Sequence, residues 1–367
     1  MFGRETTDPS IPRLEKRTTR GTEAMSSRGS NRRDKCAISF TPLITVIIVG
    51  IASLLPACSS SSSSTTPPSN IPTKLFVADE GGGAVPADVR VFPISASGNV
   101  APTATISGAM TGLVGALDMA RDGAGNIYVS DNTPSIRVFA PTASGNVAPT
   151  RVIAGPATTL STPIGMGFDA AGNLYVADFS GGGGVGSIAL FAAGANGNIA
   201  PIATISGAST GLNGAEGLAL DGSGRIWVVN QNAPNVEAFA PGSNGNVAPA
   251  ITIAGVNTGM TLATRPGYLA LDSAGNIYVS IFAANTINVF AASASGNVAP
   301  IRSISGASTS LTFPLGVLVD PAGKLYVANN QGPFITEYAA GANGNVAPVV
   351  TISGAATGFD FPIGLSF

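Results

Sequence analysis

Residues 163–178 read PIGMGFDAAGNLYVAD, two short apolar stretches joined by a tight turn. Asp169 and Gly172 mark the turn, because an Asp side chain accepts main-chain hydrogen bonds and Gly tolerates a positive φ. Two further short apolar stretches follow at 187–191 and 202–206, and no part of the unit has helical periodicity. Four short strands in about 50 residues are typical of one blade of a β-propeller.

The same unit recurs along the chain. Gly-Asn-Val/Ile-Ala-Pro occurs six times, beginning at Gly98, Gly145, Gly197, Gly245, Gly296 and Gly344. The second-strand stretch carries an aromatic residue at one register in every unit, namely Phe76, Tyr128, Tyr175, Trp227, Tyr278 and Tyr326. Repeats with this period predict an all-β, six-bladed β-propeller with four antiparallel strands per blade. We expect the aromatic residues to pack between adjacent blades.

The two ends of the repeat region complement one another. The first unit begins at a second-strand stretch, residues 74–79, with no first strand before it. The sequence then ends with FPIGLSF at 361–367, which matches the first-strand stretch FPLGVLV at 313–319. We therefore predict that the C-terminal strand completes the N-terminal blade and closes the ring, leaving no open edge between blades.

The N-terminal region has the order of an export signal. Basic residues at 31–35 precede an uncharged apolar run at 36–55, which leads into Leu54-Leu55-Pro56-Ala57-Cys58. This ending resembles the bacterial lipobox, and the resemblance implies that Cys58 is lipidated and becomes the mature N-terminus. We expect a signal peptide over 1–57, with Met25 as an alternative start, a lipid-anchored Ser/Thr/Pro linker over 58–72 and the propeller over 73–367. The alternative is a transmembrane anchor, since about 20 apolar residues suffice to span.

Composition limits the chemistry. The chain has no histidine, which excludes Ser-His and Cys-His nucleophilic catalysis, and two cysteines, Cys36 and Cys58. Nine basic and fifteen acidic residues follow Cys58, a net charge of −6. Nucleic-acid binding needs clustered positive charge, so we do not expect it. We expect a monomer, exported and anchored in the cell envelope on the periplasmic side or the cell surface, with the membrane as one partner.

Over residues 74–367, the repeated unit resembles the NHL repeat in its Pro-x-Gly start, its Asp-x-x-Gly turn and its Ile-x-Val-Phe third strand. The NHL resemblance implies a six-bladed fold shared by protein-binding modules, RNA-binding modules and an amidating lyase. The related gluconolactonase and paraoxonase superfamily includes calcium-dependent lactonases. The basic residue often found in the third strand of NHL units occurs here only at Arg90 and Arg137.

Oxygen-bearing side chains recur where the strands of such a fold would meet one mouth of the channel. Two carboxylates, Asp118 and Glu216, occupy first strands, and the second strands end in Asp79, Asp131, Asp178, Asn230, Ile281 and Asn329. One interpretation is a channel-face ligand or metal site that takes calcium, which prefers oxygen ligands. The other is that the second-strand residues cap turns. Glu216 looks like the Glu that lactonases of the superfamily place beside calcium.

No catalytic residue is predicted. We expect a cell-envelope binding scaffold for an unknown protein, glycan or small-molecule ligand. The alternatives are a calcium-dependent, lactonase-like hydrolase and a chiefly structural envelope protein.

Overall fold

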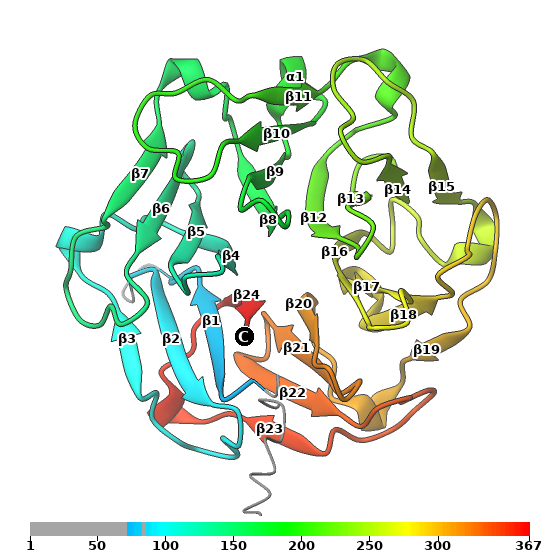
Figure 1. Ribbon diagram of the computed structural model, residues 1–367. Coiled ribbons are helices and arrows are strands. Elements are labelled where there is room, and N and C mark those ends of the chain that lie inside the picture. Colours follow the sequence, from blue (N-terminus) through cyan, green and yellow to red (C-terminus); the bar gives the residue numbers. More distant parts are fainter. Residues whose placement is uncertain (1–71, 83–85) are drawn as a thin grey trace, which may run out of the picture. The chain divides into compact units, whose positions relative to one another are not determined.

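The computed structural model describes residues 72–82 and 86–367. In these ranges it shows six four-stranded antiparallel sheets arranged as the blades of a ring (Figure 1). The predicted all-β, six-bladed propeller is therefore confirmed. No helix in the part of the chain that the structure describes is long and apolar enough to cross a membrane.

Each blade runs from an inner strand at the channel to an outer strand at the rim. Blade 1 consists of β24 (Pro362–Ser366), β1 (Lys74–Asp79), β2 (Asp88–Pro93) and β3 (Ala104–Ile106). Blade 2 consists of β4 (Ala116–Arg121), β5 (Ile127–Asp131), β6 (Ser135–Phe139) and β7 (Arg151–Ala154). Blade 3 consists of β8 (Pro163–Phe168), β9 (Leu174–Asp178), β10 (Ser187–Phe191) and β11 (Ala203–Ile205).

The remaining blades follow the same order. Blade 4 consists of β12 (Ala215–Leu220), β13 (Ile226–Asn230), β14 (Asn235–Phe239) and β15 (Ile251–Ala254). Blade 5 consists of β16 (Pro266–Leu271), β17 (Ile277–Ile281), β18 (Thr286–Phe290) and β19 (Arg302–Ile304). Blade 6 consists of β20 (Pro314–Val319), β21 (Leu325–Asn329), β22 (Phe334–Tyr338) and β23 (Val350–Ile352).

Within residues 72–82 and 86–367, helical structure is confined to single turns. A short turn, α1 (Gly181–Gly184), occupies the glycine run between β9 and β10. The 3-10 turns are η1 (Ala109–Thr111), η2 (Pro156–Thr158), η3 (Ala208–Thr210), η4 (Val256–Thr258), η5 (Phe282–Ala284), η6 (Ala307–Thr309) and η7 (Ala355–Thr357).

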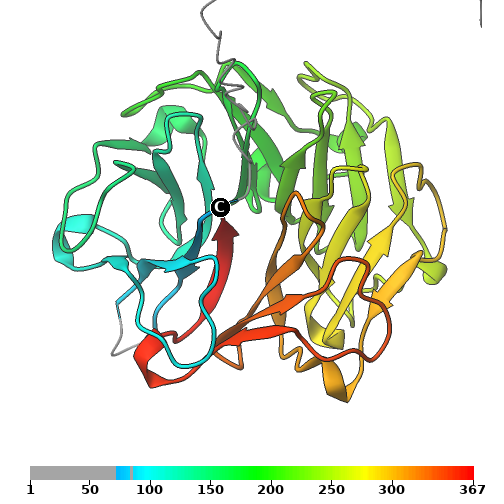
Figure 2. The same ribbon diagram turned by 60° about the horizontal axis from the view of Figure 1, so that its bottom comes forward.

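The C-terminal strand closes the ring as predicted. β24 pairs with β1 in antiparallel register, with Ser366 opposite Phe76 and Leu365 opposite Val77, and a bulge before Pro362 meets Asp79. The red strand and the blue strand lie side by side in Figures 1 and 2. The first blade thus consists of segments from both ends of the repeat region.

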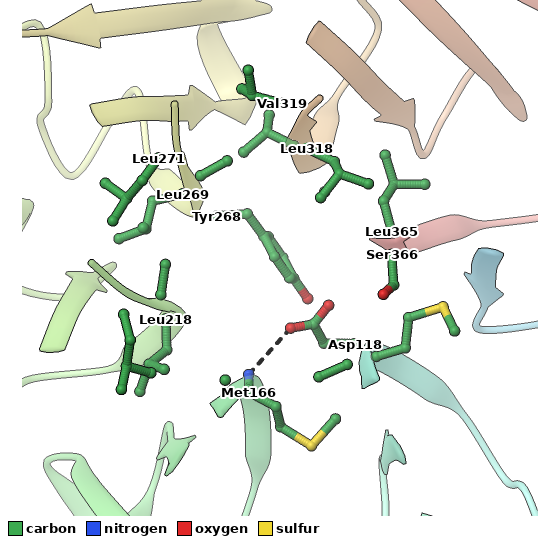
Figure 3. A pocket seen from close by; sticks show the side chains of 18 of the residues that line it. Asp118, Met166, Leu218, Tyr268, Leu269, Leu271, Leu318, Val319, Leu365 and Ser366 are labelled. Carbon is green, nitrogen blue, oxygen red and sulfur yellow. Dashed lines mark hydrogen bonds between the residues drawn. The ribbon is translucent and has the colours of Figure 1, made fainter. Parts of the chain in front are cut away.

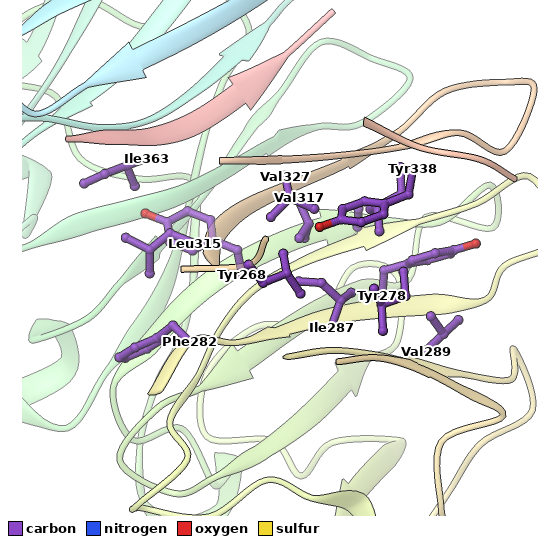
Figure 4. Close-up of a cluster of buried hydrophobic side chains, with 14 residues drawn as sticks. Tyr268, Tyr278, Phe282, Ile287, Val289, Leu315, Val317, Val327, Tyr338 and Ile363 are labelled. Atoms are coloured by element: carbon purple, nitrogen blue, oxygen red, sulfur yellow. The ribbon is translucent and has the colours of Figure 1, made fainter. Parts of the chain in front are cut away.

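The core consists of apolar clusters between adjacent blades. The cluster between blades 5 and 6 is shown in Figure 4, where Tyr278 of blade 5 packs with Val317, Val327 and Tyr338 of blade 6. Each of the six second-strand aromatic residues contributes to such a cluster with residues of the following blade. The predicted packing of these aromatic residues between blades is confirmed.

The Gly-Asn-Val/Ile-Ala-Pro motif joins blades at the rim. Gly245 makes a parallel bridge to Ile205 on the outer strand of the preceding blade. Asn246 Oδ1 then accepts a hydrogen bond from Ser209 N in η3, at 2.7 Å. Gly207, before η3, has a φ of 118°, and a Cβ there would lie 2.6 Å from the Asn246 side chain. The motif therefore covers part of each outer strand, an edge that would otherwise invite aggregation.

Candidate functional site: the central channel

The third residue of each inner strand lies at one level of the channel. These six residues are Asp118, Gly165, Gly217, Tyr268, Gly316 and Gly364. A Cβ at Gly217 would lie 2.6 Å from Tyr268 Cα, and one at Gly364 would lie 2.7 Å from Asp118 Cα. Four inner strands therefore approach the next blade too closely for a side chain. Asp118 in blade 2 and Tyr268 in blade 5 supply the two side chains at this level.

Tyr268 crosses the channel. Its hydroxyl donates a hydrogen bond to the main-chain oxygen of Leu117 on β4, the inner strand of the opposite blade, at 3.2 Å. Leu315 and Ile363 belong to the same buried cluster as Tyr268 (Figure 4), and Leu117 and Ile164 pack against that cluster. Leu117, Ile164, Leu315 and Ile363 are the second residues of their inner strands, as Glu216 is of β12.

A cavity of about 380 Å³ lies in the channel, and it includes Asp118 and Tyr268 but not Glu216. Figure 3 shows Tyr268 and Asp118 pointing toward one another across it, with Ser366 at its side. The inner strands line the cavity from the level of Asp118 to that of Arg121, three residues further along β4. Small or apolar residues form most of the wall, namely Ala120, Gly167, Ala219, Ala270, Leu318 and Leu365.

Asp118 is a buried carboxylic acid at one end of this cavity. Its Oδ2 accepts a hydrogen bond from Met166 N at 3.3 Å (Figure 3), and no described side chain donates to the carboxyl group. Burial raises the pKa of Asp118 to about 7, main-chain hydrogen bonds partly oppose that rise, and the nearby Glu216 adds to it. The side chain is thus divided between its neutral and charged forms near neutral pH.

Glu216 lies one position earlier in its inner strand than Asp118 and is also buried. Gln231 Nε2 donates to Glu216 Oε2 at 2.6 Å, and Arg265 Nη2 donates to Gln231 Oε1 at 2.7 Å. The Arg265 guanidinium stacks over the ring of Phe282, with 5.1 Å from Cζ to the centroid. Burial raises the pKa of Glu216 to about 7, although Gln231 and Arg265 both lower it.

The second-strand residues make the contacts of turn caps. Asp131 Oδ1 accepts from Gly115 N at 2.9 Å, and Asp178 Oδ1 accepts from Thr162 N at 2.6 Å. The equivalent bonds at the other positions are Asn213 N to Asn230 Oδ1, Thr312 N to Asn329 Oδ1, and Phe361 N to Asp79 Oδ1. Each side chain thus holds the loop that precedes the inner strand of its own blade. Ile281 takes this position in blade 5.

These contacts bear on the expected calcium site. The five capping side chains lie in five separate blades and direct oxygens at main-chain N–H groups. Over residues 72–82 and 86–367, no group of three or more Asp, Glu, Cys or His side chains is placed to hold a metal ion. Asp118 and Glu216 approach one another closely enough to interact electrostatically. The five capping side chains therefore do not form a calcium cage, which leaves Asp118 and Glu216 as the carboxyl groups that a cation in the channel could contact.

Three residues of the channel were missed by reasoning from the sequence: Tyr268, Gln231 and Arg265. Tyr268 was detectable, because aligning the inner strands places it where four other units have Gly, in register with Asp118. Gln231 and Arg265 lie in loops before or after strands, and their link to Glu216 depends on how blades 4 and 5 meet. Cys58, the expected signal peptide and nearly all of the linker lie outside the described residues.

Comparisons with solved structures support the fold. A protein of unknown function from Bacteroides caccae is 15% identical, with 80% of this chain and 98% of that chain covered and a TM-score of 0.57. A chain of the nidogen/laminin complex is 13% identical, with 80% and 97% covered and a TM-score of 0.55. A periplasmic gluconolactonase from Pseudomonas aeruginosa is 16% identical, with 80% and 85% covered and a TM-score of 0.53.

No protein-family model matches the chain, and no curated protein matches it. At these identities the similarity to solved structures establishes the propeller architecture and nothing about activity.

Proposed function

We propose that this propeller is a binding module that takes a small molecule into its central cavity. The observation that carries the proposal is the cavity of about 380 Å³ between the inner strands, with a buried carboxyl group and a phenol at one end. Small-molecule pockets typically occupy about 300–1,000 Å³ and combine apolar walls with a few polar groups that orient the ligand. This cavity has both properties.

A matched pair of variants tests the proposal. The Ser366 hydroxyl lies at the side of the cavity (Figure 3), so Ser366→Phe should fill it while Ser366→Ala leaves it open. A fragment library is screened against the full chain by saturation-transfer NMR. We expect hits that bind wild type and Ser366→Ala but lose at least tenfold in affinity in Ser366→Phe. Hits that bind all three proteins equally, or a screen without hits, would refute a ligand cavity and favour a protein or glycan partner or a structural role.

A calcium-dependent, lactonase-like hydrolase is the second candidate. What favours it is the presence of two buried carboxyl groups, Asp118 and Glu216, near one another in the channel of a fold that a gluconolactonase shares. Calcium binding to the folded state would raise stability by about 2.7 kcal/mol at a hundredfold excess over Kd. On this hypothesis millimolar calcium raises the melting temperature of wild type but not of the Asp118→Asn, Glu216→Gln double variant. An unchanged wild-type melting temperature rejects it.

We also propose that the module is exported and lipid-anchored through Cys58, with residues 58–72 as its tether. The support is the basic, apolar and Leu-Leu-Pro-Ala-Cys order of residues 31–58. Mass spectrometry of membrane-extracted protein should find an N-terminal, acylated Cys58. A Cys58→Ser variant should retain residues 36–57. Unmodified protein that begins elsewhere, in wild type, would show that the segment is not a lipoprotein signal.

A further inference from the structure

We propose that the ligand of the central cavity is an organic ammonium ion, with its charged nitrogen against Asp118 and its apolar body along the inner strands. This inference rests on the proposed function and deepens it by naming the ligand class. The first reason is the position of Asp118. It is 9% exposed and lines the cavity, and the hydrogen bonds that its carboxyl group accepts come from main-chain N–H groups, with Met166 N at 3.3 Å. No described side chain donates to it, so an ammonium N–H would add a charge-assisted hydrogen bond.

The second reason is the sign of the charge around this end of the cavity. Burial raises the pKa of Tyr268 well above its ordinary value, and the negative charges of Asp118, Glu216 and Glu80 add to that rise. Arg265 is the cation that lowers the pKa of Glu216, and it is already hydrogen-bonded to Gln231. A cation at the Asp118 end of the cavity would therefore meet a negative field, and the aromatic ring of Tyr268 adds a further attraction for cations.

The third reason is that the cavity suits an organic cation better than a metal ion. A metal ion needs several converging oxygens, whereas the residues that line the cavity include a single acidic side chain, that of Asp118. An alkylammonium ion needs few donors and also buries a hydrocarbon body, which the Ala and Leu residues of the wall accommodate. Asp118 and Arg121 are three residues apart on β4, about 10 Å along a strand. Arg121 at the far level of the cavity would repel a second cationic end, so the ligand carries its positive charge at one end.

The test compares three probes with the same hydrocarbon body: n-hexylammonium chloride, n-hexanol and sodium hexanoate. Binding to the full chain is measured by titration calorimetry at pH 8 in phosphate buffer, because amine buffers would compete. We expect the ammonium probe to bind wild type at least tenfold more tightly than hexanol, and hexanoate to bind most weakly. In Asp118→Asn, which keeps the acceptor for Met166 N, affinity for the ammonium probe should fall to that for hexanol, with hexanol unchanged.

The outcomes separate this inference from the proposed function. If hexanol and hexylammonium bind wild type equally, or if Asp118→Asn retains the preference for the cation, the ammonium inference is wrong while the cavity still binds ligands. If no probe binds, the inference is also wrong, and the fragment screen with Ser366→Phe decides separately whether the cavity binds any molecule. Ser366→Phe should reduce binding of hexylammonium and hexanol alike.

A pH series supplies an independent readout. The cation requires charged Asp118, whose pKa is raised to about 7 by burial and by Glu216. The other titratable groups at this end are Glu216 on β12, Tyr268 on β16 and Glu80 after β1, Met166 N is the partner from β8, and Arg121 is the charged residue at the far level of the cavity. The ionised fraction of an acid with this pKa rises about tenfold between pH 6 and pH 8. We therefore expect hexylammonium affinity to rise by about that factor over this range, and hexanol affinity to stay constant.

Discussion

Deletion of residues 361–367 should lower the free energy of unfolding by more than about 5 kcal/mol, because it removes β24 and opens the ring. Three side chains of this strand, those of Pro362, Ile363 and Leu365, are buried, and burial of an aliphatic side chain contributes about 1.5–3 kcal/mol. The deletion also removes the pairing with β1 and leaves the β1 edge without a partner. At about 2–4 °C per kcal/mol, the melting temperature should fall by at least about 10 °C.

A permuted chain is the matched control. Ser366 lies opposite Phe76 in the antiparallel pair, so the end of β24 lies beside the start of β1. A turn of two to four residues, a length on the order of ordinary hairpin loops, can therefore join residue 367 to Lys74. Moving 361–367 to this place should restore most of the lost melting temperature, measured by circular dichroism. A deletion that melts with wild type would show that the strand does not hold the ring together.

Neutralising the two buried acids should stabilise the propeller at alkaline pH. The pKa of Asp118 is raised from 3.8 to about 7, and that of Glu216 from 4.5 to about 7, in both cases mainly by burial. At pH values between the ordinary and the raised pKa, the two carboxyl groups stay protonated in the folded state but have lost their protons in the unfolded state. The contribution of these groups to the free energy of unfolding therefore falls as pH rises from about 4 to 7 and is constant above that.

The Asp118→Asn, Glu216→Gln double variant removes this dependence while keeping the acceptors for Met166 N and Gln231 Nε2. Each group opposes folding by on the order of 3 kcal/mol at pH 8 in the absence of a bound cation. We therefore expect the double variant to melt at least about 10 °C above wild type at pH 8 and close to wild type at pH 4. Urea unfolding at both pH values is the second measurement.

Glu237 and Asp88 also have raised pKa values, and both are unchanged in the variant. Their contribution to the pH dependence of stability is therefore the same in both proteins and cancels when the two are compared. A stability difference that is the same at pH 4 and pH 8 would mean that the gain does not come from ionisation. A double variant less stable than wild type at pH 8 would mean that the two carboxylates make favourable contacts that the amides cannot replace.

The sequence by itself determined the fold of this protein, because each step depends on local or repeated patterns. The Asp-x-x-Gly turns set the strand pairs, the six motifs beginning at Gly98 set the number of blades, and the match between 313–319 and 361–367 set the closure. Alternating burial then directs each second-strand aromatic residue toward the next blade. The alternative that Asp131, Asp178, Asn230 and Asn329 cap turns was also available from local chemistry.

Only the tertiary structure decided what the channel contains. Tyr268 reaches Leu117 because ring closure brings β16 and β4, which are 151 residues apart at this contact, to opposite sides of one channel. The Glu216, Gln231 and Arg265 chain likewise depends on how two blades meet. Whether a carboxyl group is buried, satisfied or facing a cavity depends on the curvature that six sheets adopt together. Aligning the repeats shows where a single blade departs from the others, as at Tyr268, but not which residues the departing side chain contacts.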